Sequence, residues 1–277
     1  MINKYAGRCG TCGRRVAAGA GQAANVDGRW SSYHNGCVPV RVAPPVGRHG
    51  GWHDLPVVGF DLEGTLPEPM ETRIVSAALV HSDGTTREWL VDPGVPIPAD
   101  ATARHRITDE MVRADGRPAR EALAELGTAI AKLIADSTPL VAFCAPYDVT
   151  ALHTELARHG LPAIDWDQAV VIDPSVLHQQ VEPRWYDGRT LGDLCRYYEV
   201  TLDNAHDAAS DARAAAELAR SLAARHERVA LMRPDALHQA QIGWHAEQAR
   251  DLQRYFDRQG IDKTVSTQWP LETTPRD

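Results

Sequence analysis

The sequence has no long apolar run, no recognisable secretory signal and few cysteines. No segment approaches the roughly 18 consecutive apolar residues that a membrane-spanning helix needs, and Met1–Ala6 lacks the apolar stretch of a signal peptide. The five cysteines are odd in number and unevenly placed, which argues against a disulfide scaffold and for a reducing compartment. We therefore expect a cytoplasmic protein with no membrane partner. We also find no internal repeat.

Charge is distributed unevenly along the 277 residues. The net charge of −8 at first argues against a nucleic-acid partner, but residues 1–50 carry about +6 and the remainder about −14. Part of the acidity of the remainder is consistent with carboxylates that bind cations. A hydrophobic fraction of 43% is ordinary for a globular protein, and the length allows one substantial core plus an accessory module.

Residues 1–38 contain a set of metal-ligand residue types. The spacing is C-x2-C, 21 residues, then H-x2-C, formed by Cys9, Cys12, His34 and Cys37. Two close pairs of ligands can surround one tetrahedral Zn²⁺, and such a small segment needs the metal in order to fold. The role of this zinc would be structural, because all four positions are filled. A redox C-x-x-C and a disordered arm are the alternatives, but no βαβ pattern surrounds the cysteines.

After a linker rich in Pro and Gly at 39–54, residues 55–228 read as one α/β domain. A first strand ends in two acids, and further strands are expected at 72–81, 86–92, 140–143 and 169–172. Helices are expected at 119–135, at 146–159, after Thr190 with Asp193 as a capping box, and at 207–225. Three strands in an antiparallel meander, followed by alternating helices and strands, predict a mixed five-stranded sheet flanked by helices.

Residues 229–277 form a C-terminal extension. A helix is expected from Pro234 to about Arg258, followed by an extended tail that Trp269 anchors. The expected apolar stripe, which we predict to dock on the domain or on a partner, consists of Leu237, Trp244, Leu252, Tyr255 and Phe256.

The first strand of the domain carries Asp61 and Glu63. On a strand, positions i and i+2 point to the same face, about 6.6 Å apart. This spacing suits two carboxylates that bind divalent ions about 3.5–4 Å from each other. Because unpaired charge is expensive to bury, a core strand has no structural use for two neighbouring acids. A strand end at which both acids reach water is the alternative, and this segment alone leaves both open.

Three further residues come from other elements. Asp148 lies in the first turn of a helix that follows a strand, where an acid is also favourable at the positive helix end. Asp211 shares a helix face with Ala215 and Leu218, so we expect it to be buried and to need a partner. His206 comes just before the same helix, five residues ahead of Asp211.

These residues belong to motifs that resemble those of a known family. Phe60–Thr65, Ala145–Asp148 and His206-x4-Asp211 are similar, in this order, to the three exonuclease motifs of the DEDDh (DnaQ-like) 3′→5′ exonucleases. The segment Arg104–Glu110 looks like the H-G-I-T loop of that family, which lies near the terminal nucleotide. The resemblance covers about residues 55–225 and implies a ribonuclease H-like fold.

The resemblance implies a role for each matching position. Asp61, Glu63, Asp148 and Asp211 would bind two Mg²⁺ or Mn²⁺ ions, with His206 as the general base, consistent with the preference of hard ions for oxygen ligands. Substrate contacts would come from Leu62, Gly64, Thr65, His105, Ile107, Cys144 and Tyr147. The sequence departs from the family in Gly64, where Thr is common, Leu66, where Gly is common, Cys144, where Asn is usual, and Arg106, where the loop has Gly. These departures affect specificity rather than the metal ligands.

The implied substrate is the 3′ end of a nucleic acid, with single-stranded DNA favoured over RNA. A DNA polymerase or another replication or repair protein is the expected partner, since the family includes a proofreading subunit. Two other functions are alternatives to an exonuclease. The segment Asp61–Leu66 also looks like the first motif of haloacid dehalogenase-like phosphatases, but it has Glu at the second acidic position and we find no later acidic pair. The basic first 50 residues alternatively suggest a nucleic-acid-binding protein without catalysis.

Overall fold

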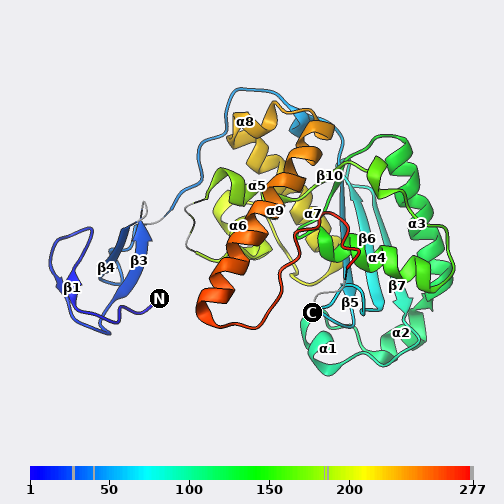
Figure 1. Ribbon diagram of the computed structural model, residues 1–277, viewed down its shortest axis with the longest axis horizontal. Coiled ribbons are helices and arrows are strands. Elements are labelled where there is room, and N and C mark those ends of the chain that lie inside the picture. The colour runs from blue at the N-terminus through cyan, green and yellow to red at the C-terminus, as the bar shows by residue number, and fades with distance from the viewer. Residues whose placement is uncertain (27–28, 40, 184, 186, 275–277) are drawn as a thin grey trace. The chain divides into compact units, whose positions relative to one another are not determined.

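The computed structural model describes residues 1–26, 29–39, 41–183, 185 and 187–274. Its contacts divide the chain into two units. The first comprises Met1–Pro44 and Glu182–Gly188, and the second comprises Pro45–Val181 and Arg189–Asp277 (Figure 1).

The first unit contains two small antiparallel pairs of strands. One pair is β1 (Gly7–Arg8) with β2 (Arg15–Val16), and the other is β3 (Gln22–Val26) with β4 (Arg29–Tyr33). Its buried apolar cluster consists of Cys9, Val16 and Tyr33 with a few half-buried neighbours. A cluster of this size provides little hydrophobic stabilisation, which agrees with a module that depends on a metal.

The second unit is built on one mixed sheet with the strand order β10-β9-β5-β6-β7-β8. The pairs β5–β6 and β6–β7 are antiparallel, which confirms the predicted meander, and the other pairs are parallel. Five strands were predicted, and the sixth, β8, has only two residues, too few for any pattern of alternation. The strands are β5 (Val58–Gly64), β6 (Ile74–His81), β7 (Thr86–Asp92), β8 (Arg117–Pro118), β9 (Leu140–Val141) and β10 (Val171–Ile172).

The helices that the sequence predicts in this unit are present where they are expected. α7 (Ala208–Arg225) packs against β5 and β6, while α3 (Ala119–Ala135) packs against β7 and against α4 (Pro146–Arg158) (Figure 1). α6 (Leu191–Tyr198) begins with the expected capping box between Thr190 and Asp193. These helices confirm the expected α/β layers around the sheet.

Several short helices were not predicted. The segment Arg104–Glu110, which resembles a loop of the family, includes the end of α1 (Ala99–His105) and the start of α2 (Asp109–Asp115). Each has only one or two buried side chains, so neither shows an apolar period. The others are α5 (Pro174–Val181), α8 (Glu227–Ala230), and the 3₁₀ turns η1 (Trp52–Asp54) and η2 (Trp166–Gln168).

The C-terminal helix α9 (Pro234–Gln259) packs on α5 and on β10, so it docks on its own domain. The predicted apolar stripe is wrong in its second half, because Leu252 and Tyr255 are exposed. Leu237 is buried as predicted, and the other buried positions of α9 are His238, Gln241 and Ala249. Trp269 in the tail is buried, as predicted. Among the helices that the structure describes, none is both long and apolar enough to cross a membrane.

Candidate active site

The first two candidate ligands stand on the central strand β5. Phe60 and Leu62 are buried in the core, while Asp61 is half-buried and Glu63 is buried. Helix α7 lies directly on this strand. A Cβ at Gly59 would come within 2.0 Å of the carbonyl oxygen of Ala212, so only glycine permits this approach. The close packing brings the N-terminal turn of α7 next to the end of β5.

The third carboxylate comes from α4. Asp148 lies in the first turn of this helix and is only 2% exposed. One of its oxygens, Oδ1, accepts a hydrogen bond of 3.0 Å from the backbone N–H of Leu62, the residue between Asp61 and Glu63. This bond ties the start of α4 to β5 and brings Asp148 to the two acids of the strand.

Asp211 and His206 complete the group from α7. The backbone N–H of His206 donates to Asp211 Oδ2 at 3.1 Å, and His206 itself has a left-handed backbone with φ of 65° and an exposed side chain. The ligand atoms of Glu63, His206 and Asp211 all lie within 4.8 Å of one another. Asp211 Oδ1 is buried and has no hydrogen-bond partner among the described residues. A buried, unpaired carboxylate oxygen is the kind of atom that a cation would satisfy.

The carboxylates repel one another. Burial, followed by the charge of Asp211, raises the pKa of Glu63 to about 7, and Arg104 opposes this shift. The pKa of Asp61 is raised by burial and then by the charges of Asp148 and Glu63. Burial is also the main cause that raises the pKa values of Asp148 and Asp211. Massed acids of this kind are unfavourable alone and favourable around divalent cations, so the residues fit a metal site.

The structure explains one departure from the family pattern. Gly64 stands where Thr is common, and a Cβ there would lie 2.3 Å from Thr72 Oγ1 and 2.7 Å from the hydroxyl of Tyr147. The Tyr147 hydroxyl donates to the carbonyl oxygen of Leu66 at 2.7 Å. Tyr147 and Thr72 thus occupy the space that a larger side chain would need. Leu62, Gly64 and Thr65 all lie at or just after the end of β5, beside the acids.

The other expected substrate contacts lie at the end of α1 (His105), just after it (Ile107), just before α4 (Cys144) and in its first turn (Tyr147). Two residues in these segments have left-handed backbone. Arg106, which replaces the family glycine, has φ of 65°, and Cys144 has φ of 60°. His105 is buried, and its Nδ1 accepts from the backbone N–H of Ile107 at 3.1 Å. Burial and the nearby Arg104 lower the pKa of His105, so it is neutral and carries its proton on Nε2. Arg106 thus holds a left-handed backbone conformation that glycine adopts at no steric cost.

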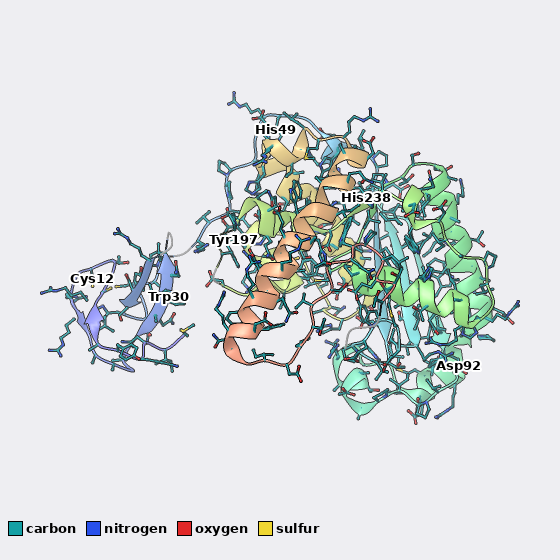
Figure 2. All side chains as sticks on the ribbon, viewed as in Figure 1. Cys12, Trp30, His49, Asp92, Tyr197 and His238 are labelled. Atoms are coloured by element: carbon teal, nitrogen blue, oxygen red, sulfur yellow. The ribbon has the colours of Figure 1, made fainter. Side chains whose placement is uncertain are left out.

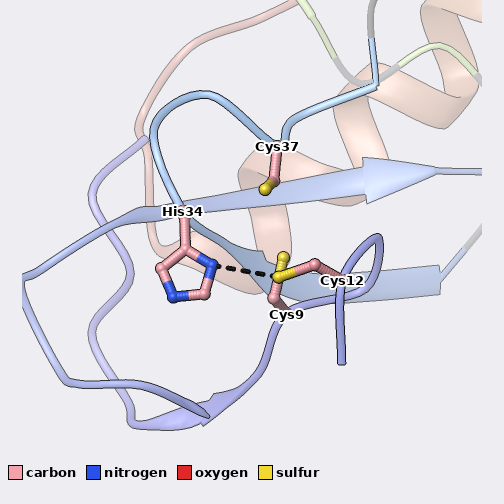
Figure 3. A group of neighbouring side chains, drawn as sticks. All are labelled: Cys9, Cys12, His34 and Cys37. Atoms are coloured by element: carbon pink, nitrogen blue, oxygen red, sulfur yellow. Dashed lines mark hydrogen bonds between the residues drawn. The ribbon is translucent and has the colours of Figure 1, made fainter. Parts of the chain in front are cut away.

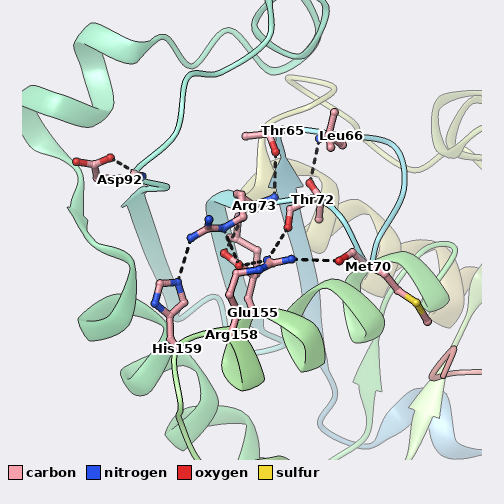
Figure 4. A network of polar contacts seen from close by, with 11 residues as sticks. Thr65, Leu66, Met70, Thr72, Arg73, Asp92, Glu155, Arg158 and His159 are labelled. Carbon is pink, nitrogen blue, oxygen red and sulfur yellow. Dashed lines mark hydrogen bonds and ion pairs between the residues drawn. The ribbon is translucent and has the colours of Figure 1, made fainter. Parts of the chain in front are cut away.

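A polar network behind the site was not found from the sequence. Glu155 on α4 is fully buried and accepts from Arg73 Nε at 2.9 Å and from Arg158 (Figure 4). Arg158 also donates to the carbonyl oxygens of Met70 and Thr72. The network holds the turn after β5 against α4. Arg73 and Glu155 are far apart in the sequence and belong to no motif, so no local signal could have paired them.

The first unit contains the expected cluster of thiols and imidazole. The ligand atoms of Cys9, Cys12, His34 and Cys37 lie within 4.8 Å of one another (Figure 3). Burial raises the pKa of the Cys9 thiol, but hydrogen bonds from Cys12, His34 and Thr11 together lower this pKa to about 5. His34 Nε2 lies 3.2 Å from the carbonyl oxygen of Arg15, which leaves Nδ1, 3.4 Å from Cys12 Sγ, as the nitrogen available to a metal. Three thiols and one imidazole nitrogen at this spacing fit tetrahedral Zn²⁺.

Comparison with known proteins identifies the family of this chain. The family model described as Exonuclease matches residues 58–219, and the chain belongs to this exonuclease family. The chain is 31% identical over 169 residues to the PolC-type DNA polymerase III of Streptococcus sanguinis (strain SK36) and 32% identical over 170 residues to that of Streptococcus agalactiae serotype III (strain NEM316). Each match covers 60% of this chain but 11% of the relative, so the chain spans about a tenth of the relatives' length.

Solved structures show the same fold. An Escherichia coli Exonuclease I complex with single-stranded DNA, in a zinc-bound form, aligns with a TM-score of 0.55 at 18% identity over 72% of this chain and 45% of that chain. The complex of Exonuclease I with a dT13 oligonucleotide aligns with a TM-score of 0.52 at 17% identity over 63% of this chain and 42% of that one. At this identity the likeness concerns the fold. The family and the fold that the three motifs implied are thereby confirmed.

Proposed function

We propose that this protein is a metal-dependent 3′→5′ exonuclease that removes nucleotides from single-stranded DNA, with RNA as the second substrate to be tested. One observation carries the proposal: Glu63 of β5 and Asp211 of α7 converge with His206, and one buried oxygen of Asp211 has no partner among the described residues. Asp148 of α4 is tied to the same strand by its hydrogen bond from the N–H of Leu62. The exonuclease family and the single-stranded DNA in the Exonuclease I complexes support the choice of substrate.

The roles follow from the chemistry of each group. Asp61, Glu63, Asp148 and Asp211 would hold two Mg²⁺ or Mn²⁺ ions, which when bound stabilise the attacking and leaving oxygens of an in-line displacement. His206, exposed beside the acids, takes a proton from the attacking water. The water oxygen bonds to phosphorus as the P–O3′ bond breaks. A nucleoside 5′-monophosphate leaves, and the freed 3′ oxygen of the shortened strand takes a proton from solvent water to become a 3′ hydroxyl.

The substrate contacts complete this proposal. Leu62, Gly64 and Thr65 would contact the terminal nucleotide from β5, since they flank the acids. His105, which lies against the backbone of Gly64, would contact this nucleotide through Nε2, with Ile107 beside it. The remaining members of the proposed set are Cys144 and Tyr147.

The first unit would hold one structural Zn²⁺ and bind phosphates. Its Lys4 and Arg29 are exposed, and residues 1–50 carry about +6. The test uses Asp148→Ala, so that the oligonucleotide is bound but not cut. Adding Lys4→Gln and Arg29→Gln to this protein should reduce the salt dependence of oligonucleotide binding. Adding Lys263→Gln, in the second unit, is the control and should leave the salt dependence unchanged. Equal salt slopes in all three proteins would overturn this role.

A DNA polymerase or repair partner is proposed because the relatives are polymerases.

The activity test uses a 5′-labelled single-stranded DNA and its RNA twin, with Mg²⁺ or Mn²⁺. A ladder shortening from the 3′ end, absent in EDTA and in Asp148→Ala, is the expected result, and the preferred strand identifies the sugar. Retained binding without cleavage would favour a nucleic-acid-binding protein. Loss of both, with a phospho-aspartyl intermediate on Asp61, would favour the phosphatase alternative.

A further inference from the structure

The C-terminal extension lies beyond residues 58–219, the part of the chain that matches the family model. Two side chains of α9, His238 and Gln241, bind the free edge of the sheet (Figure 2 labels His238). His238 Nδ1 accepts from the N–H of Val171 at 3.0 Å, and Gln241 Nε2 donates to the carbonyl oxygen of Val171 at 3.0 Å. Gln241 Oε1 accepts from the N–H of Asp173 at 2.8 Å. These side chains take the place of a further strand beside β10.

Asp173, which directly follows β10, binds the turn that begins α4. Its side chain is fully buried. Asp173 Oδ1 accepts from the N–H of Cys144 at 3.1 Å, and Oδ2 accepts from the N–H of Ala145 at 2.9 Å. Cys144 is the residue with left-handed backbone, and α4 begins two residues later. The carboxylate of Asp173 therefore fixes the entry of the helix that carries Asp148 in its first turn.

The C-terminal tail also contacts Asp173 and α4. Trp269 is 5% exposed, and its Nε1–H donates to Asp173 Oδ2 at 3.4 Å. Its ring centre lies 5.0 Å from that of His238. Three residues further on, the N–H of Glu272 donates to Thr150 Oγ1 at 2.9 Å, in a buried contact on α4 itself. The tail thus binds both Asp173 and the helix that carries Asp148.

We propose that Asp173 and Trp269 are positioning residues that hold Asp148 in its metal-binding place, so that the C-terminal extension is part of the active-site scaffold. This inference rests on the proposed function, in which Asp148 binds metal. A buried carboxylate that loses a donor is destabilised, because water cannot replace the bond. The Cys144–Ala145 turn would then loosen, and Asp148 would no longer stay in register with the N–H of Leu62. Groups that orient a metal ligand commonly change metal affinity by about 10–100-fold when mutated.

The test compares two substitutions that each remove one buried indole N–H and keep an aromatic ring. Trp269→Phe removes the donor to Asp173. Trp52→Phe is the matched control, because Trp52 is 2% exposed and donates to the carbonyl oxygen of Val229. Val229 lies in α8, which packs against α7 at the end opposite to Asp211. Calorimetric titration with Mn²⁺ measures the affinity of each zinc-loaded protein, and thermal unfolding measures its stability. Oligonucleotide KM and kcat are then measured at saturating Mn²⁺.

Trp269→Phe should weaken Mn²⁺ binding by about 10-fold, the lower end of the range for such groups, with KM for the oligonucleotide unchanged. Trp52→Phe should lose similar thermal stability and bind Mn²⁺ like the wild type. If Trp269→Phe does not fold, Thr150→Val, which removes the acceptor for Glu272, should weaken Mn²⁺ binding in the same direction. The proposal would be overturned if Trp269→Phe, or Thr150→Val where Trp269→Phe does not fold, bound Mn²⁺ with the same affinity as the wild type and Trp52→Phe. If Asp148→Ala also bound Mn²⁺ like the wild type, the proposed metal site itself would be wrong.

Discussion

Replacing Glu63 with glutamine should make the metal-free protein more stable while removing its activity. Burial and Asp211 raise the pKa of Glu63 to about 7 from its ordinary 4.5. The side chain is 9% exposed, so solvent screens the repulsion poorly. In the unfolded chain the carboxyl regains the ordinary pKa. The folded state therefore binds the proton more tightly, and stability declines as the pH rises from 4.5 through 7.

The size of this effect follows from the shift. A difference of about 2.5 pKa units corresponds to about 3 kcal/mol at pH 8, whereas at pH 5 the effect is about 1 kcal/mol or less. Glu63→Gln has no such term, because glutamine does not ionise. Its free energy of unfolding should therefore exceed that of the wild type by up to about 3 kcal/mol at pH 8 without divalent ions. In Mn²⁺ the wild type should be more stable than Glu63→Gln, because only the wild type keeps the Glu63 carboxylate that binds the metal.

Urea unfolding at pH 5 and pH 8, in EDTA or Mn²⁺, measures these differences. Both proteins lose zinc in EDTA alike, so the comparison isolates Glu63. Glu88→Gln is the matched control, because Glu88 lies on β7 and is exposed. We expect this control to follow the wild type. Equal dependence on pH in the wild type and Glu63→Gln, or a less stable Glu63→Gln at pH 8 in EDTA, would refute the reasoning.

Three further predictions address the base, the packing of α7 and the zinc cluster. His206→Ala should slow single-turnover hydrolysis by about 10²–10⁴-fold at unchanged stability, and a rate near that of the wild type would exclude it as the base. Gly59→Ala should lower the free energy of unfolding by about 1–3 kcal/mol, because its Cβ would lie 2.0 Å from the Ala212 oxygen; an unchanged urea midpoint would contradict this packing. Cys12→Ser should lower the zinc content below that of the wild type, as elemental analysis can measure, and equal zinc in both proteins would remove Cys12 from the ligand set.

Local patterns in the sequence pointed to the residues of the candidate site. Asp61 and Glu63 stand at i and i+2 of a strand, and Asp211 stands on the apolar face of a helix, so each is recognisable within a few residues. The long helices were predicted for the same reason. Their apolar period and their caps, such as Thr190 with Asp193, depend on near neighbours in the chain.

Only the tertiary structure decided which neighbours the predicted helices and strands pack against. The buried face of α9 contains His238 and Gln241 rather than Leu252 and Tyr255, because this helix lies against the edge of a sheet. That edge presents unpaired N–H and C=O groups, which apolar side chains cannot satisfy. An amphipathic pattern predicts a hydrophobic neighbour and carries no information about such an edge.

The residues that position the site could not be predicted from the sequence for the same reason. Asp173 resembles any acid at the end of a strand, and Trp269 any anchored aromatic residue in a tail. Their bond joins positions 96 residues apart and depends on the packing of β10 and the tail. The sequence by itself determined which carboxylates gather at the end of β5, since their spacing is local. Only the folded chain decided which buried donors hold them there, because a hydrogen bond depends on distance in space.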